Sequence, residues 1–166
     1  MKKILIFISL FSFVSYSQTY NDVMSINSEK MFLKVVIENG YEFDSTTDND
    51  WITYGFNIVR DSIDGNKSTK WSSYNIKDDR FYFGFSRNSI LANFLGLEDD
   101  NSENLYDKIV EKIKNNCKYF DIIKYKNSKG SEQDYVCYSC SDSKYKGKIG
   151  FMISEGWGVI RHFPNN

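Results

Sequence analysis

The residues best suited to metal binding, redox chemistry or nucleophilic catalysis are three cysteines and a single histidine. They are Cys117, Cys137, Cys140 and His162. Their number fits a Cys3His zinc site, which needs four ligands. If residues 134–140 (DYVCYSC) form a strand, however, successive side chains alternate between its faces, so Cys137 and Cys140 point in opposite directions. A strand also lacks the helix start that a redox Cys-x-x-Cys pair requires. The sequence therefore argues against both zinc and redox chemistry.

Strand alternation also bears on disulfide pairing. With about 3.3 Å of rise per residue, the Cα atoms of Cys137 and Cys140 would lie roughly 10 Å apart, too far for a bond. Cys117 continues the apolar stripe of a predicted helix, and Cys140 falls on the inward face of its strand. We expect a Cys117–Cys140 disulfide in an oxidising compartment, with Cys137 as a free thiol. Three separate small apolar residues are the alternative.

Catalysis by histidine would have to use His162, close to the end of the last predicted strand. Cys137 could serve as a nucleophile with His162 as its base. The sequence offers neither a third group to orient the base nor an oxyanion hole, and it lacks phosphate loops and dinucleotide fingerprints. We expect an ordinary strand-end histidine, no catalytic residue and no cofactor.

Acidic residues gather in predicted loops, at Asp48 and Asp50, Asp78 and Asp79, and 98–100. Such runs are usually solvated, but paired carboxylates also hydrolyse glycosidic bonds. A small hydrolase of envelope polymers is therefore an alternative hypothesis. Residues 99–103 begin like a calcium loop but lack its glycine and its closing glutamate, so we expect no metal site.

The first seventeen residues have the pattern of an export signal. Two lysines precede the apolar run 4–14, and the small residues Ser15 and Ser17 precede a cleavage point before Gln18. The run is shorter than the roughly 20 residues that a membrane-spanning helix needs. We predict a cleaved signal peptide and an exported protein, periplasmic or secreted, with no membrane span. Residues 18–166 would form a single domain.

Composition narrows the class of protein further. The net charge is −1, without the clustered basic face that nucleic-acid binding requires. Aromatic residues make up 17% of the chain, with twelve tyrosines and thirteen phenylalanines. Large aromatic side chains favour β-strands, where they pair across neighbouring strands. We expect a strand-rich domain that does not bind nucleic acid.

Hydrophobic periodicity predicts three helices, at 25–39, 87–97 and 103–116. It predicts strands at 51–59, 70–76, 80–86, 118–126, 134–141, 148–154 and 157–163. Phe81, Phe83 and Phe85 share one face of their strand. We predict an α+β fold with two main helices on one face of an antiparallel sheet of about seven strands.

The two halves of the chain show a similar order of segments. The matching stretches are GYEF (40–43) with CKYF (117–120), DWITYGF (50–56) with DYVCYSC (134–140), and RFYFGFS (80–86) with KIGFMIS (148–154). They indicate two imperfect α-β repeats, with chance similarity as the alternative. This order resembles the tandem architecture of the β-lactamase-inhibitor-protein fold, in which helices back a curved sheet. The resemblance rests on element order, and no inhibitory motif matches.

The face of the sheet turned away from the helices is the candidate binding surface. By alternation it carries Gly55, Tyr82, Gly84, Tyr135, Ser139, Gly150 and Met152. Mixed small and aromatic residues suit a surface that receives a partner, although a solvated sheet face also tolerates them. Our hypothesis is a non-enzymatic binding or inhibitor-like protein that uses Tyr82, Gly84, Tyr135 and Met152 to contact another protein or an envelope component. A structural envelope protein is the remaining alternative.

Overall fold

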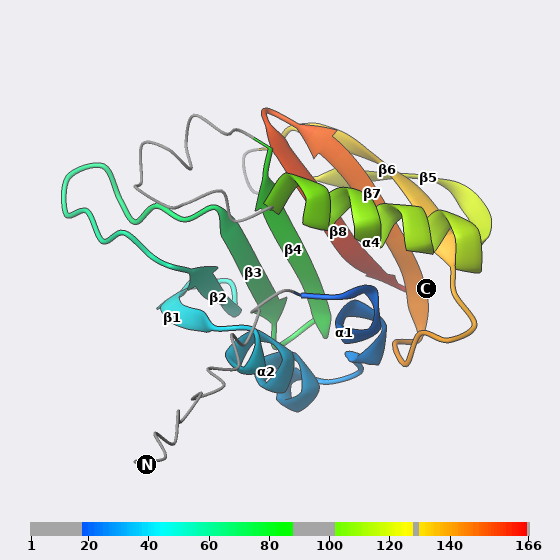
Figure 1. The fold of residues 1–166 in the computed structure, drawn as a ribbon, viewed down its shortest axis with the longest axis horizontal. Coiled ribbons are helices and arrows are strands. Elements are labelled where there is room, and N and C mark those ends of the chain that lie inside the picture. The colour runs from blue at the N-terminus through cyan, green and yellow to red at the C-terminus, as the bar shows by residue number, and fades with distance from the viewer. Residues whose placement is uncertain (1–17, 88–101, 128–129, 166) are drawn as a thin grey trace, which may run out of the picture.

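The computed structural model describes residues 18–87, 102–127 and 130–165, and their strands form one antiparallel sheet with helices packed on one of its faces (Figure 1). The predicted export signal at 1–17 lies outside the described residues. So do nearly all of the predicted helix at 87–97 and the start of the calcium-like stretch. Within the described ranges, no helix combines the length and the apolar character needed to cross a membrane.

The sheet has eight strands rather than seven, in the order β1-β2-β3-β4-β8-β7-β6-β5. Their bounds are β1 Tyr41–Thr46, β2 Trp51–Phe56, β3 Lys70–Asn75, β4 Arg80–Ser86, β5 Lys118–Lys126, β6 Glu132–Ser139, β7 Gly147–Ser154 and β8 Trp157–Pro164. Each half of the chain is a four-stranded meander, and the halves join where β4 pairs with β8. The alignment of 80–86 with 148–154 was wrong, because it matches the fourth strand of one half with the third strand of the other.

The expectation of two main helices was also wrong, because the described helices are few and small. They are α1 Tyr20–Ser25, α2 Glu29–Glu38 and α4 Ser102–Asn116. The predicted helix at 25–39 starts later because the Ser28 side chain accepts a hydrogen bond from the backbone N–H of Met31 and caps the first turn. Gly40, at φ 75°, follows the end of α2.

The hydrophobic core lies between these helices and the inner face of the sheet. Phe81, Phe83 and Phe85 of β4 are all fully buried there, which confirms the predicted inward face of this strand. The ring of Phe32 in α2 lies 6.1 Å from that of Phe83, and Tyr106 in α4 lies 6.2 Å from Phe85. Burial of each phenylalanine contributes about 1.5–3 kcal/mol. This packing fixes which side of the sheet faces the helices.

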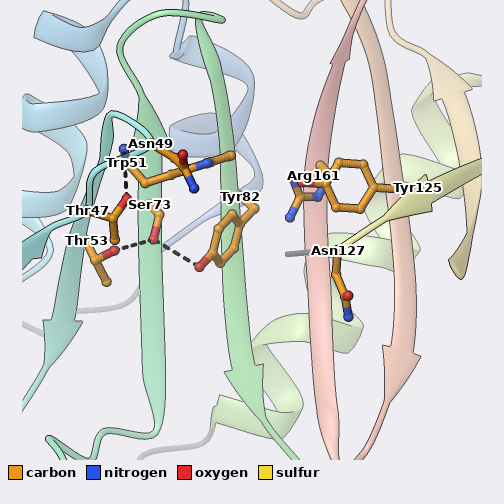
Figure 2. A pocket seen from close by; sticks show the side chains of 9 residues that line it. All are labelled: Thr47, Asn49, Trp51, Thr53, Ser73, Tyr82, Tyr125, Asn127 and Arg161. Atoms are coloured by element: carbon orange, nitrogen blue, oxygen red, sulfur yellow. Dashed lines mark hydrogen bonds between the residues drawn. The ribbon is translucent and has the colours of Figure 1, made fainter. Parts of the chain in front are cut away.

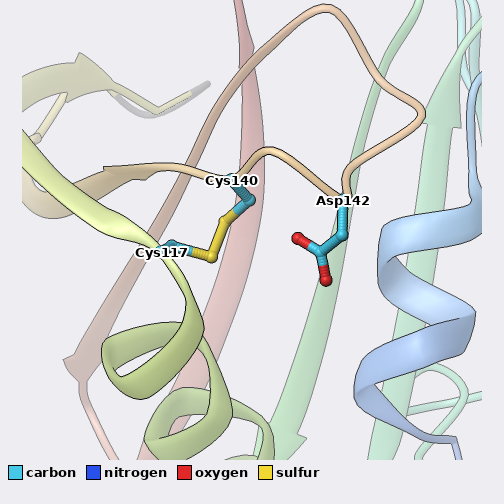
Figure 3. Close-up of side chains that lie close together, drawn as sticks. All are labelled: Cys117, Cys140 and Asp142. Carbon is cyan, nitrogen blue, oxygen red and sulfur yellow. A yellow bond between two sulfur atoms is a disulfide. The ribbon is translucent and has the colours of Figure 1, made fainter.

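A disulfide joins Cys117, directly after α4, to Cys140, directly after β6, as predicted (Figure 3). The Cα atoms lie 4.5 Å apart. The Tyr20 hydroxyl lies 3.7 Å from the Cys117 sulfur and donates a hydrogen bond to Asp142 at 2.7 Å, so α1 contacts the same region. Burial and the hydrogen bond to Asp142 raise the pKa of Tyr20 to about 12. Cys117, Cys140 and Asp142 are close enough to share a metal ion, but the disulfide occupies both sulfurs.

The disulfide should account for a large share of the stability. Replacing Cys117 or Cys140 with Ser removes a cross-link between residues 23 positions apart, which should lower the free energy of unfolding by about 3 kcal/mol in urea titrations. Thiol counting should find one thiol in the oxidised protein, on Cys137, and only after denaturation, since burial raises the pKa of this thiol to about 11. A Cys137→Ala variant should show no thiol at all. Peptide mapping that found a Cys117–Cys137 bond would contradict this pairing.

Candidate functional site

The outer face of the sheet carries a charged residue at its centre. Arg161 lies on β8, paired in register with Tyr82 of β4 on one side and Gly150 of β7 on the other. Its neighbours in sequence, Ile160 and His162, are fully buried on the inner face. Strand alternation therefore turns Arg161 away from the helices.

A hollow with a volume of about 330 Å³ lies on this outer face, around Arg161 (Figure 2). It is lined by Thr47, Asn49, Trp51, Thr53, Ser73, Tyr82, Tyr125, Asn127 and Arg161; we call it the Arg161 pocket. Trp51 comes from β2 and Tyr125 from β5, with five strands between them. In a flat sheet these two strands would lie roughly 29 Å apart, at about 4.8 Å per strand. The outer face must therefore be concave.

Aromatic rings surround the Arg161 guanidinium. Its central carbon lies 4.0 Å from the ring centre of Tyr125, 4.9 Å from Tyr82, 5.7 Å from Trp51 and 5.8 Å from Tyr135. These distances allow cation–π attraction to several rings. The side chain is only 7% exposed, yet Nε and Nη1 have no hydrogen-bond partner among the described residues. Hydrogen-bonding capacity of a cation is thus left unused inside the pocket.

Hydroxyl groups form a chain along the opposite wall of the pocket (Figure 2). The Ser73 hydroxyl donates to the Tyr82 hydroxyl at 3.0 Å, and the oxygens of Thr53 and Ser73 are 2.9 Å apart. Because a serine hydroxyl has a single proton, Ser73 must accept the proton of Thr53. The Tyr82 hydroxyl accepts at the end of this chain, so its own proton is not used within the chain. It can be donated to a ligand.

The structure brings only part of the predicted binding surface into this pocket. Tyr82 lines it, whereas Gly84 and Met152 lie elsewhere on the sheet. Tyr135 is on the outer face but is 1% exposed, with the rings of Tyr125 and Phe163 packed against it at 6.2 and 5.3 Å. Burial raises the pKa of Tyr135, and the charge of Arg161 together with a hydrogen bond between the two side chains opposes that rise. Tyr135 therefore supports the site from beneath rather than offering contact area.

Sequence reasoning missed the residue at the centre of the site. Arg161 is a single charged residue within a strand of mostly apolar side chains, and its alternation with Ile160 and His162 was the available signal. Trp51 shares its face with Thr53, so alternation could also have placed it outward. No local pattern links Tyr125 to either residue.

Three of the acidic loop residues lie close together beside the Arg161 pocket. Asp48, Asp50 and Asp78 line a second hollow of about 320 Å³, which shares Asn49 and Trp51 with the first and includes Lys77. Asp79 does not line this hollow, and its carboxylate accepts a hydrogen bond from the hydroxyl of Tyr74. The acidic residues at 98–100 lie outside the described part of the chain.

His162 and Cys137 are on opposite faces of the sheet, so they cannot form a nucleophile–base pair. The His162 ring is fully buried on the inner face, with its centre 3.6 Å from that of Phe81 and 4.7 Å from that of Tyr145. The Cys137 thiol lies on the outer side, where it donates to the Tyr135 carbonyl. The interpretation of His162 as an ordinary strand-end residue was wrong. Burial lowers its pKa well below the ordinary value.

This burial predicts a loss of stability in mild acid. The folded protein holds His162 neutral, while the unfolded chain takes up a proton below about pH 6.5. Unfolding is then favoured by about 1.4 kcal/mol for each further pH unit, until the lowered pKa of the folded state is reached. Denaturant titrations between pH 7 and 5 should show this slope in the native protein. His162 is the only histidine in the chain, so His162→Phe has no imidazole and should not show this slope. Parallel pH profiles for the two proteins would contradict the assignment.

Comparison with known proteins leaves the site to be interpreted from its own geometry. The chain matches no protein-family model, and neither a curated protein nor a solved structure is significantly similar to it. The functional argument therefore depends on the Arg161 pocket and on the acidic hollow beside it.

Proposed function

We propose that the protein is an exported, non-enzymatic binding protein of inhibitor-like type, which receives its partner on the concave outer face of the sheet. The predicted signal peptide supports export, and so does the Cys117–Cys140 disulfide, because disulfides persist in oxidising compartments. The helix-backed curved sheet is compatible with the resemblance to the β-lactamase-inhibitor-protein fold. Fold alone does not define function, so the proposal depends on the site.

The observation that carries the proposal is the composition of the Arg161 pocket. Its nine lining residues include three aromatic rings and five neutral side chains that can form hydrogen bonds, with Arg161 as the only charged one. None of the nine is a histidine, a cysteine or a carboxylate, the side chains that most often act as general bases or nucleophiles. Aromatic residues and arginine are enriched where proteins hold partners. The pocket is suited to binding.

A hydrolase acting on envelope polymers is the second candidate, and one observation favours it. Asp48, Asp50 and Asp78 line a common hollow that opens next to Trp51, where a polymer bound to the outer face would pass. Paired carboxylates are the usual machinery of glycoside hydrolysis. Both candidate functions place the bound molecule on the same face of the sheet. They differ in its fate, because a hydrolase cleaves the molecule and a binding protein leaves it unchanged.

Capture of a partner tests the binding proposal. The oxidised protein, immobilised and exposed to medium and envelope fractions of the cells that produce it, should retain a specific component. Trp51→Ala and Tyr82→Ala should lose it, because both side chains line the Arg161 pocket. Tyr119→Ala is the matched control, since Tyr119 is a half-exposed tyrosine outside the pocket. Circular dichroism would establish that each variant is folded.

Two outcomes would contradict the proposal. Equal retention by Trp51→Ala, Tyr82→Ala and the native protein would remove the outer face as the binding surface. New reducing ends in a retained polymer, formed by the native protein but not by Asp50→Asn, would show a hydrolase instead. We expect the retained component to be recovered chemically unchanged.

A further inference from the structure

We propose that the Arg161 pocket binds the carboxylate of a small hydroxylated acid, of the uronic acid type, with Arg161 as the anchor. The inference rests on the proposed binding function because it concerns the same pocket, and it adds the chemical class of the ligand. Three features carry it: the two unpartnered nitrogens of the guanidinium, the charge of its surroundings and the hydroxyl wall.

Two of the three guanidinium nitrogens are buried without an acceptor. Arg161 is more than nine-tenths buried, and its Nε and Nη1 atoms have no partner among the described residues. Removing a cation from water costs several kcal/mol unless it is paired and hydrogen-bonded. The surrounding rings attract the charge, and Tyr135 shares a hydrogen bond with the guanidinium, but Nε and Nη1 still have no acceptor. A ligand acceptor would therefore offset a cost that the folded protein already carries.

The stacking of Tyr125 determines what kind of acceptor fits. Its ring centre lies 4.0 Å from the central carbon of Arg161, close enough for the ring to cover the guanidinium. A cation covered in this way approaches a ligand through its edge, where the N–H groups form a planar fork. Carboxylates match that fork with two parallel hydrogen bonds.

Charge in and around the pocket favours a single negative charge on the ligand. Arg161 is the only charged residue among the nine that line the pocket. The adjacent hollow contains Asp48, Asp50 and Asp78 against one Lys77. Because the two hollows share Asn49 and Trp51, these carboxylates lie beside a ligand in the Arg161 pocket and repel a dianion more strongly than a monoanion. A carboxylate therefore fits better than a doubly charged phosphate.

The remaining lining indicates that the acid carries hydroxyl groups. The chain from Thr53 through Ser73 ends at the Tyr82 hydroxyl, whose proton can be donated to the ligand. The amide of Asn49 also lines the wall and can both donate and accept hydrogen bonds. A volume of about 330 Å³ is at the small end of the range for ligand sites and suits a molecule of monosaccharide size.

Isothermal titration calorimetry of the oxidised protein tests the proposal with four probes: glucuronate, glucose, acetate and inorganic phosphate. Glucuronate should bind more tightly than any of the others. Glucose lacks the carboxylate, acetate lacks the hydroxyls, and phosphate carries the additional charge. Glucuronate should also raise the melting temperature, because it binds only the folded state.

Arg161→Met keeps most of the side-chain volume and removes the charge. It should lower glucuronate affinity by roughly 10- to 100-fold, the loss expected for hydrogen bonds to a charged group. Its melting temperature without ligand should be no lower than that of the native protein, since a buried charge with two unpartnered nitrogens is removed. Arg60→Met is the matched control, because Arg60 is exposed and lies outside the pocket. This control should bind glucuronate as the native protein does.

Several outcomes would overturn the inference. These are failure of glucuronate to bind the native protein, undiminished binding to Arg161→Met, phosphate binding at least as tight as glucuronate, or acetate binding equal to glucuronate. A lower melting temperature of Arg161→Met together with no binding of any probe would show a purely structural cation. A partner could also be captured in a way that depends on Trp51 and Tyr82 but is unchanged in Arg161→Met. That result would support the binding function and contradict the proposal that the ligand is a carboxylate.

Discussion

Burial of the aromatic inner face of the sheet against the helices is the interaction on which the rest of this structure depends. Phe81, Phe83 and Phe85 are withdrawn from water beneath α2 and α4. Because side chains alternate along a strand with a period of two, this packing also determines the opposite face. Tyr82 and its register partner Arg161 are turned outward as a consequence. A slip of β4 by one residue would expose the phenylalanines, and the same slip of β8 would bury Arg161 in the core.

Residues on the outer face pack closely around the Arg161 side chain. Gly150 lies opposite Arg161, and a Cβ atom there would come within 2.7 Å of the Cys137 sulfur and of the Phe163 ring. The absence of a Cβ atom at Gly150 leaves room for Phe163 to pack against Tyr135, whose ring lies 5.8 Å from the central carbon of Arg161. The curvature of the sheet brings Trp51 and Tyr125 to the same pocket from distant strands. The aromatic surroundings exclude water from a guanidinium whose Nε and Nη1 still lack hydrogen-bond partners among the described residues.

The Arg161 pocket and the acidic hollow beside it differ in charge, and each supports one of the two candidate functions. Asn49 and Trp51 belong to both, so a molecule long enough to span them would meet Arg161 at one end and the carboxylates of Asp48, Asp50 and Asp78 at the other. Such a surface selects ligands by where their charges lie. A small acid held at Arg161 would occupy one hollow and leave the other to solvent.

The sequence by itself determined the elements with strong local patterns and the faces that alternation assigns. The bounds of β4 and β5 agree with prediction, and the Cys117–Cys140 disulfide followed from helical spacing combined with strand alternation. Only the tertiary structure decided that Tyr135 is covered, that His162 lies in the core and that Trp51 and Tyr125 line the same pocket. Periodicity reports the direction of a side chain relative to its own strand. Depth of burial and convergence of distant strands depend on sheet curvature, which arises from packing between residues far apart in the chain.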